Sequence, residues 1–405
     1  MIAHSKPTLN GEDFSAVEEV LRSGNIAQGA KVVQLEENMA GFIGAKAEGV
    51  AVSSGTAALH LALKALKVGK GDEVILPSYV CTALLNAINY EGAKPVLADI
   101  CPDSFNLDVS AAKKALSKNT RAIILPHLSG LPADIEEFLT LGVPLIEDCA
   151  QALGATYRGR MVGGLSTFSI FSFYATKLIT TGGGGMLFSD SQKLLDEVRD
   201  LREYDNRDDY RVRYNYKLTD LQAALGLSQL ERLPSFLARR REIAQRYTEA
   251  MQHIPVVLPR AYPDREHIYY RYVIRIDGIE AQRHRVTKVR SDKEELGRYL
   301  ELLHRKGIGC QRPVYRPLHH YLGLRGFPIT DKVWQTALSL PIYPSLTDDE
   351  QEKIISEVEE IINPCCGDHH NPKLCKIPGM SLRGLSRAEV PSETREQARE
   401  LDKAI

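Results

Sequence analysis

Three groups of residues in this chain have the types that bind an anion or react with a carbonyl group. The first is Ser53-Ser54-Gly55-Thr56, which stands directly before a run of helix formers that starts at Ala57. Backbone N–H groups at a helix start, together with small residues and hydroxyls, bind phosphate. Serine and threonine also begin many helices as ordinary N-caps. The motif alone therefore leaves both interpretations open.

The second group is built around Lys177, which follows the aromatic, β-prone segment at 168–174 and precedes the glycine run at 182–185. Apolar surroundings disfavour the charged form of lysine, and a neutral amine can form a Schiff base. Glycines let the backbone approach a flat ligand closely. A solvated loop cation is the alternative. A dinucleotide-binding loop fits poorly, because the glycines follow the lysine and no helix opens there.

The third group is Glu147-Asp148, at the end of an otherwise apolar strand. A carboxylate there can be a metal ligand, a general base, the partner of a buried cation, or an acid that faces solvent. A phosphate site, a reactive amine and a carboxylate together match what pyridoxal phosphate needs. This cofactor requires a lysine for its imine and an acid against its pyridine nitrogen.

The elements that must position these residues read as an α/β fold. A chain of 405 residues favours two domains. Helical patterns cover 12–22 and 57–66, and a long one at 215–250 leads into a smaller domain. Buried strands are predicted at 73–76, 95–99, 122–125 and 144–148. Apolar runs of this kind are typical of a mostly parallel sheet between helices, with ligands beyond the carboxyl ends of its strands.

A set of ordered segments resembles the DegT/StrS sugar aminotransferases, within the fold-type I pyridoxal phosphate enzymes. The matching segments are SSGTAALHLAL (53–63), GDEVILPSYV (71–80), HLSGLPADI (127–135), IEDCAQALGATYRGR (146–160), FSFYATKLITTGGGG (171–185), YNYKLTDLQAA (214–224), PVYRPLH (313–319) and LSLPIYPSLTDDE (338–350). The resemblance implies a large cofactor-binding domain with a mostly parallel mixed sheet at 1–240. It also implies a smaller α+β domain at 241–363, and residues 364–405 then form an extension.

The resemblance also implies a role for each matching residue. Lys177 would hold the cofactor as a Schiff base and shuttle a proton, and Asp148 would pair with the pyridine nitrogen. Gln151 would lie near the phenolic oxygen or the ring face. Others would bind the phosphate or the sugar. Phosphate ligands would be Gly55, Thr56, Ser172 and, from the neighbouring subunit of a homodimer, Asn215, while Tyr315 and His319 would lie near the sugar substrate.

The resemblance implies transfer of an amino group from an amino acid, most simply glutamate, to a keto sugar. It further implies that this sugar is nucleotide-linked and that the reaction serves amino-sugar or surface-polysaccharide biosynthesis. Two alternatives keep the cofactor. A related sugar dehydratase would carry histidine in place of Lys177. A non-catalytic regulatory protein would have less reason to retain both the lysine and the acid.

Three positions depart from the family pattern. Cys81 stands where an aromatic ring usually stacks on the cofactor, so Tyr79 or another side chain would have to supply that stacking. The run at 182–185 lacks the usual glutamate. The extension contains a Cys/His cluster whose spacing matches no standard zinc finger, so it is either a metal site or a reduced surface tail. Its members are Cys365, Cys366, His369, His370 and Cys375.

Composition excludes several other classes of function. Lysine and arginine number 51 against 52 acidic residues, so no broad positive field attracts nucleic acid or an anionic membrane. The polar N-terminus lacks a secretory signal, and no apolar run is long enough to span a bilayer. Seven cysteines in so long a chain, four of them scattered and three clustered near the end, do not look like a disulfide framework. These features favour a cytoplasmic enzyme.

Overall fold

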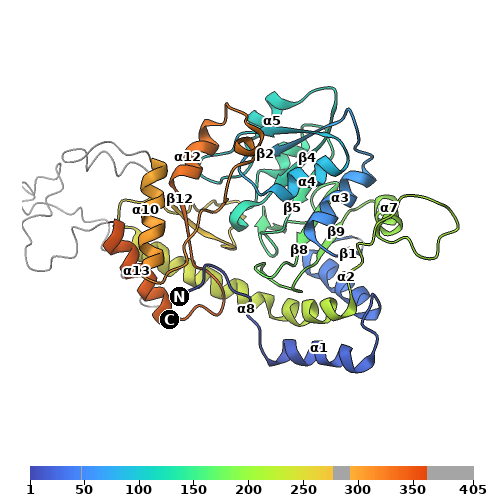
Figure 1. Ribbon diagram of the computed structural model, residues 1–405, viewed down its shortest axis with the longest axis horizontal. Coiled ribbons are helices and arrows are strands. Elements are labelled where there is room, and N and C mark those ends of the chain that lie inside the picture. The colour runs from blue at the N-terminus through green and yellow to red at the C-terminus, as the bar shows by residue number, and fades with distance from the viewer. Residues whose placement is uncertain (47, 277–291, 363–405) are drawn as a thin grey trace, which may run out of the picture. The chain divides into compact units, whose positions relative to one another are not determined.

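The computed structural model describes residues 1–46, 48–276 and 292–362, and one compact unit spans Met1–Asn363 (Figure 1). The cysteine and histidine cluster of the extension lies outside the described residues, so the two interpretations of it stay open. The division of the chain at residue 240 also stays a prediction, since helix α8 (Asp220–Met251) runs across that position without a break.

A mixed sheet of seven strands forms the centre of the N-terminal part, as the sequence predicts. Its strand order is β1-β9-β8-β5-β4-β2-β3. The pairs from β3 to β8 are parallel, and only β9 runs against its neighbours β8 and β1. The strands are β1 (Val50–Val52), β2 (Glu73–Pro77), β3 (Lys94–Ala98), β4 (Thr120–Pro126), β5 (Leu145–Asp148), β8 (Phe168–Ser172) and β9 (Gly185–Phe188).

The two faces of this sheet bury two separate apolar clusters, because alternate side chains of a strand point to opposite faces. In β4, Ala122 and Ile124 pack into one cluster and Ile123 and Leu125 into the other. On the first face lie α3 (Gly55–Ala65), α4 (Thr82–Tyr90) and α7 (Gln192–Arg202). On the second face lie α2 (Ala30–Ile43), α5 (Val109–Ala115), α6 (Ile135–Leu139) and the first half of α8.

Helix α8 is one continuous helix of 32 residues, although Pro234 lies inside it. A proline there removes one backbone hydrogen bond, and packing on both sides of Pro234 supports the helix. Leu233 belongs to the second sheet-face cluster, and Tyr247 belongs to the core of the C-terminal part. Helix α1 (Gly11–Ser23) runs alongside α8 (Figure 1), where buried Asp13 contacts Gln229 and Arg232.

The C-terminal part has a core of its own around a two-stranded antiparallel sheet. This sheet pairs β11 (Tyr272–Arg275) with β12 (Ala337–Leu340). The helices of this core are the end of α8 together with α10 (Asp292–Arg305) and α13 (Asp348–Ile362). Helix α12 (Pro328–Thr336) belongs to a separate apolar cluster, in which Val333 packs with Val273 and Ala337. A short helix α11 (Leu318–Leu322) connects the C-terminal part to the N-terminal part, because the Leu318 N–H bonds to the Ser78 carbonyl at 2.8 Å.

A small sheet of three strands lies outside the main one, in the order β10-β6-β7. Its strands are β6 (Thr156–Tyr157), β7 (Arg160–Met161) and β10 (Arg265–Glu266). Among the helices in the described ranges, none has both the length and the hydrophobicity that crossing a bilayer requires.

Candidate active site

The predicted site residues gather at one edge of the main sheet. Strands β2, β4, β5 and β8 are parallel, and β1 points the same way because β9 is antiparallel to both β1 and β8. Asp148 and Ser172 are the last residues of β5 and β8. Gly55 and Cys81 follow β1 and β2. The carboxyl ends of parallel strands meet at the same edge, so distant stretches of the sequence come together there.

The start of α3 forms a narrow cradle against the end of β8. Ser54 is the N-cap, and its side chain accepts a hydrogen bond from the Ala57 N–H at 3.0 Å. A methyl group on Gly55 would lie 2.9 Å from Ser172 Cβ, so no residue with a side chain fits at position 55 without a shift. Thr56 follows in the first turn, half-buried. The first turn of α3 thus brings its backbone N–H groups close to Ser172, and N–H and hydroxyl donors suit a phosphate.

Two residues of the glycine run serve the protein's own packing. A methyl group on Gly185 would lie 2.6 Å from the backbone of Ser54, and one on Gly184 would lie 2.5 Å from Thr181 Oγ1. These glycines therefore let β9 and the preceding turn pack closely against the cradle. The close approach that the sequence suggested is seen here between parts of the chain itself.

Asp148 is a buried acid whose side chain accepts one hydrogen bond from the residues that the structure describes. Its Oδ1 accepts from the Ala150 N–H at 3.0 Å, and only 8% of the residue is exposed. Burial raises the pKa of Asp148, while that hydrogen bond and the charges of Lys177 and His127 partly offset the rise. A cationic N–H placed against this carboxylate would satisfy it.

Lys177 lies in the loop after β8, where its N–H bonds to the Tyr174 carbonyl at 2.8 Å. Its Nζ is 5.2 Å from the centre of the Tyr270 ring, within the range of a cation–π contact. Gln151 lies nearby on the wall of the same pocket, and its Oε1 accepts from the Ser129 N–H at 2.9 Å. Lys177 and Gln151 therefore line one pocket, and the charge of Lys177 acts on the Asp148 carboxyl group. The roles of these three residues toward a cofactor stay predictions.

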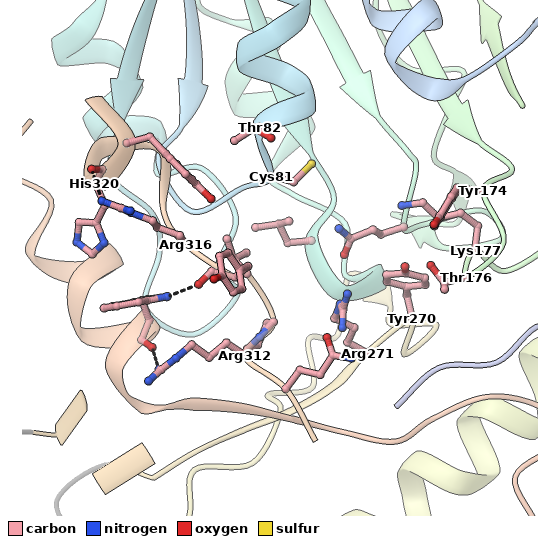
Figure 2. Close-up of a pocket in the computed structure, with 18 of the residues that line it drawn as sticks. Cys81, Thr82, Tyr174, Thr176, Lys177, Tyr270, Arg271, Arg312, Arg316 and His320 are labelled. Atoms are coloured by element: carbon pink, nitrogen blue, oxygen red, sulfur yellow. Dashed lines mark hydrogen bonds between the residues drawn. The ribbon is translucent and has the colours of Figure 1, made fainter. Parts of the chain in front are cut away.

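Lys177 and Gln151 line a pocket of about 1080 Å³ (Figure 2). Of the predicted site residues, four line the pocket: Cys81, Gln151, Lys177 and Tyr315. The lining also contains side chains that the sequence analysis did not single out. They are Thr82, Tyr174, Thr176, Tyr270, Arg271, Arg312, Arg316, His320, Tyr321 and Trp334. Arg316 stands inside the matching segment at 313–319, a signal that was present in the sequence, whereas Arg271 falls within an ordinary strand pattern.

Tyr79 and His319 are placed differently from the other predicted residues. Tyr79 is 1% exposed and packs edge-on against Phe105, with ring centres 6.2 Å apart, so it does not line the pocket beside Cys81. His319 is also buried. Its ring nitrogens contact Ser78 Oγ at 2.6 Å and Asp331 Oδ1 at 3.1 Å, and the neighbouring His320 reaches the pocket instead. The cofactor role of Tyr79 and the substrate role of His319 stay predictions.

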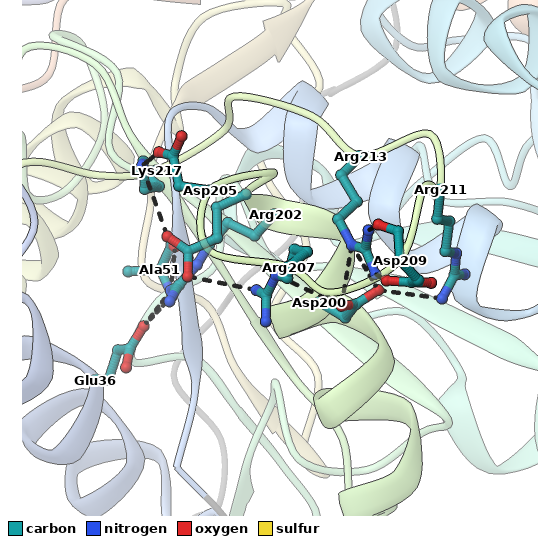
Figure 3. Close-up of polar contacts among 11 residues, drawn as sticks. Glu36, Ala51, Asp200, Arg202, Asp205, Arg207, Asp209, Arg211, Arg213 and Lys217 are labelled. Carbon is teal, nitrogen blue, oxygen red and sulfur yellow. Dashed lines mark hydrogen bonds and ion pairs between the residues drawn. The ribbon is translucent and has the colours of Figure 1, made fainter.

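Asn215 lies on an exposed loop that is held by charged residues (Figure 3). Asp200 of α7 contacts Arg213 at 3.0 Å and Arg211 at 3.2 Å. The loop then returns to the sheet, where the Ser53 N–H bonds to the Tyr216 carbonyl at 2.7 Å. The loop is thus fixed next to the phosphate cradle, while the Asn215 side chain is exposed to solvent.

Two solved structures are similar to this chain over 90% of its length. The aminotransferase TlmJ from Streptoalloteichus hindustanus is 31% identical with a TM-score of 0.83, and all of that chain is covered. Spr1654 from Streptococcus pneumoniae, described as a sugar aminotransferase and solved in its PLP form, is 27% identical with a TM-score of 0.82, with 99% of it covered. Fold and site together define a pyridoxal phosphate-dependent sugar aminotransferase of fold type I.

Sequence comparison assigns the family. The model of the DegT/DnrJ/EryC1/StrS aminotransferase family matches residues 7–359, and the chain belongs to this family. The chain is also similar to the spore coat polysaccharide biosynthesis protein SpsC from Bacillus subtilis. The two are 36% identical over 389 residues, which cover 89% of this chain and 97% of SpsC.

The residues present fit pyridoxal phosphate. The cradle at Gly55 excludes a side chain but offers N–H donors, and the buried Asp148 carboxylate accepts only one hydrogen bond from the described part of the chain. A phosphate bound in the cradle would account for its N–H donors, and a protonated ring nitrogen would account for the buried carboxylate.

Proposed function

We propose that this enzyme transfers the amino group of glutamate to a keto sugar carried by a nucleotide, in the synthesis of a surface polysaccharide. The charge of the pocket carries the proposal. Lys177, Arg271, Arg312 and Arg316 line it, and its described lining contains no aspartate or glutamate. Such a pocket favours substrates with several negative charges. Glutamate carries two carboxylates and a nucleotide-linked sugar carries phosphates, and the likeness to SpsC supports the polysaccharide context.

Each predicted residue has a task that fits its position. Bound pyridoxal phosphate supplies an electron sink and a carrier for the amino group. The Lys177 amine would hold the cofactor and then move a proton to and from the α-carbon of the substrate. Asp148 would keep a proton on the ring nitrogen, and the N–H groups at Gly55 and Thr56 with the Ser172 hydroxyl would bind the phosphate. Gln151 would lie at the ring.

Arg312 and Arg316 would bind the nucleotide portion at the other side of the pocket from Lys177 (Figure 2). Arg312 lies 4.8 Å from the centre of the Trp334 ring, and Arg316 lies 4.8 Å from that of Tyr321. Guanidinium groups fixed against aromatic rings present their N–H donors to phosphate oxygens. Tyr315, which is 84% exposed, would contact the substrate at the entrance.

The proposed active unit is a homodimer in which Asn215 reaches the phosphate of the neighbouring subunit. The exposed side chain and the fixed loop beside the cradle support this assignment. Mixed dimers test it, because Lys177→Ala and Asn215→Ala chains damage different sites. Their mixture should recover about a quarter of wild-type activity through one intact site in each mixed dimer. Recovery no greater than the sum of the two variants would contradict a shared site.

The function is tested by separating the two half-reactions. Enzyme loaded with pyridoxal phosphate should lose its visible absorbance when glutamate is added and regain it with a nucleotide-linked keto sugar, and mass spectrometry should detect an amino sugar. Lys177→Ala should lack both the initial absorbance and the product, whereas the exposed Lys46→Ala control should retain both. A deoxy sugar without nitrogen would indicate a dehydratase. Bound cofactor with no half-reaction would indicate a non-catalytic protein.

A further inference from the structure

We propose that Arg271, held in place by His4, forms a carboxylate-binding subsite beside Lys177 that takes a carboxylate of the amino donor. The inference rests on the proposed function, since it names the side chain that recognises the donor. It concerns two residues, His4 and Arg271, that lie outside the sequence segments quoted above for the family resemblance.

Arg271 lies on the same side of the pocket as Lys177 (Figure 2). Both side chains contact one aromatic ring: Lys177 Nζ is 5.2 Å and Arg271 Cζ is 5.5 Å from the centre of Tyr270. The backbone fixes this arrangement, because the Arg271 N–H bonds to the Ser129 carbonyl at 3.2 Å. An amino acid that reacts at Lys177 therefore has the Arg271 guanidinium within reach of its carboxylates.

The hydrogen-bonding capacity of Arg271 is not filled by an acid. Among the residues that the structure describes, no aspartate or glutamate forms an ion pair with Arg271, and its buried Nε has no hydrogen-bond partner. Buried Arg240 shows the contrast, since its guanidinium donates to three backbone carbonyls at 3.1 to 3.3 Å. A buried guanidinium N–H without an acceptor is costly, and a carboxylate is its preferred bidentate partner.

His4 supports Arg271 from behind. The buried His4 ring lies 3.2 Å from Arg271 Nη1 through Nε2, and the same Nε2 is 2.9 Å from Ser339 Oγ. Burial and the neighbouring Arg271 charge lower the pKa of His4 to about 3. The imidazole is thus neutral near pH 7 and supports the guanidinium without neutralising its charge. The positive charge of Arg271 stays available to a ligand in the pocket.

The opposite wall explains why the donor carboxylate is assigned to Arg271. Arg312 donates to the Trp334 carbonyl at 2.6 Å and Arg316 to the His320 carbonyl at 2.9 Å. In Figure 2 both arginines lie on the opposite side of the pocket from Lys177. A phosphate-bearing group can bind these two arginines while its sugar extends toward Lys177. A small amino acid that must reach Lys177 with its α-carbon is left with Arg271.

Binding of glutarate, an unreactive dicarboxylate, provides a test that does not depend on turnover. With enzyme that carries pyridoxal phosphate, calorimetry should show glutarate binding about 30-fold more weakly to Arg271→Gln than to wild type. Arg271→Lys, which keeps the charge without the planar fork, should lose less, and the exposed Arg22→Gln control should match wild type. Glutarate affinity unchanged in Arg271→Gln would overturn the proposal.

The rates of the two half-reactions provide a second test of the Arg271 subsite. Arg271→Gln should slow the reaction with glutamate and leave the reaction of the aminated enzyme with keto sugar within about threefold of wild type. If the reaction with alanine as amino donor slows as much as the reaction with glutamate, Arg271 binds the α-carboxylate. If only the reaction with glutamate slows, Arg271 binds the side-chain carboxylate. Both outcomes support the subsite. A loss confined to the keto-sugar reaction, or weaker binding of uridine diphosphate with unchanged glutarate binding, would overturn it.

His4 is a positioning residue that holds the Arg271 guanidinium, and the His4→Asn variant separates this role from a role in folding. His4→Asn should raise the KM for glutamate several-fold with little change in the KM for the keto sugar, at an unchanged far-ultraviolet dichroism spectrum. Equal changes in both KM values would contradict the role. If no donor reacts with the wild type, the proposed function fails. Weaker glutarate binding by Arg271→Gln would still support the subsite in that case.

Discussion

Two neighbouring acids at the end of β5 have opposite environments. Glu147 is fully buried and accepts hydrogen bonds from His127 Nε2 at 3.2 Å, from the Gly163 N–H at 3.2 Å and from the Leu165 N–H at 3.0 Å. Asp148 accepts from the Ala150 N–H alone among the bonds found for its side chain in the described residues. Because the side chains of successive strand residues alternate, the two acids point to opposite faces of the sheet.

The pKa values of the two acids shift in opposite directions. Burial raises the pKa of both carboxyl groups. For Glu147 the hydrogen bond and charge of His127, with the loop N–H groups, outweigh burial, so its pKa is lowered. For Asp148 burial prevails, and its pKa is raised. A buried acid with its partners supports the fold, whereas a buried acid without them is ready for a ligand that brings a cation.

The largest expected effect separates the two acids by activity. Asp148→Asn should lower kcat/KM by about 10³-fold, since it removes the charge opposite the ring nitrogen. Glu147→Gln should leave the kcat/KM of the folded fraction within a few-fold of wild type. Steady-state kinetics of both variants, with cofactor occupancy measured by absorbance, checks this. Similar losses in the two variants would remove the distinction between them.

The next effect separates the acids by stability. Glu147→Gln should lower the free energy of unfolding by about 3 kcal/mol, because it breaks a buried network of charge-assisted hydrogen bonds. Urea unfolding of the cofactor-free protein at pH 7 measures this, with Asp148→Asn as the matched control. The pKa of Glu147 is lowered, so its contribution is present above the ordinary value of 4.5 and is lost as the pH falls through the folded-state pKa. A difference that does not shrink in acid would contradict this origin.

The sequence predicts the residues that belong to local patterns. Asp148 ends an apolar strand, Gly55 and Thr56 begin a helix, and Lys177 follows a β-prone segment, and each of these patterns appears as an element of the fold. Their meeting at one edge follows from the parallel sheet, which the strand patterns also predict. Local periodicity and turn chemistry are sufficient for this part of the site.

Other parts depend on contacts that no local pattern carries. His4 meets Arg271 across 267 positions of the chain, and only the tertiary packing of the N-terminal segment against β12 brings them together. Position 319 shows a similar limit, since adjacent histidines look equivalent in sequence. The local turn of α11 directs His319 to Ser78 and leaves His320 at the pocket. Helix α8 likewise continues through Pro234, which packing on both sides of the proline supports.

The smallest expected effect returns to Asp148 without its cofactor. Because its folded-state pKa is raised above the ordinary value of 3.8, the ionised carboxylate destabilises the fold once the pH exceeds that value. Asp148→Asn should therefore stabilise the cofactor-free protein at pH 7 by about 1 kcal/mol, measured by urea unfolding. The gain should disappear below pH 3.8, where both states of the wild type are protonated.

Bound cofactor should then reverse the order of stability of wild type and Asp148→Asn. Pyridoxal phosphate stabilises whichever form binds it more tightly, and wild type has the acid that pairs with the ring nitrogen. With saturating cofactor at pH 7, wild type should unfold at a higher urea concentration than Asp148→Asn, although it unfolds at a lower one without cofactor. If Asp148→Asn were the less stable protein in both conditions, Asp148 would resemble Glu147 as a structural acid, and its environment would need no ligand to explain it.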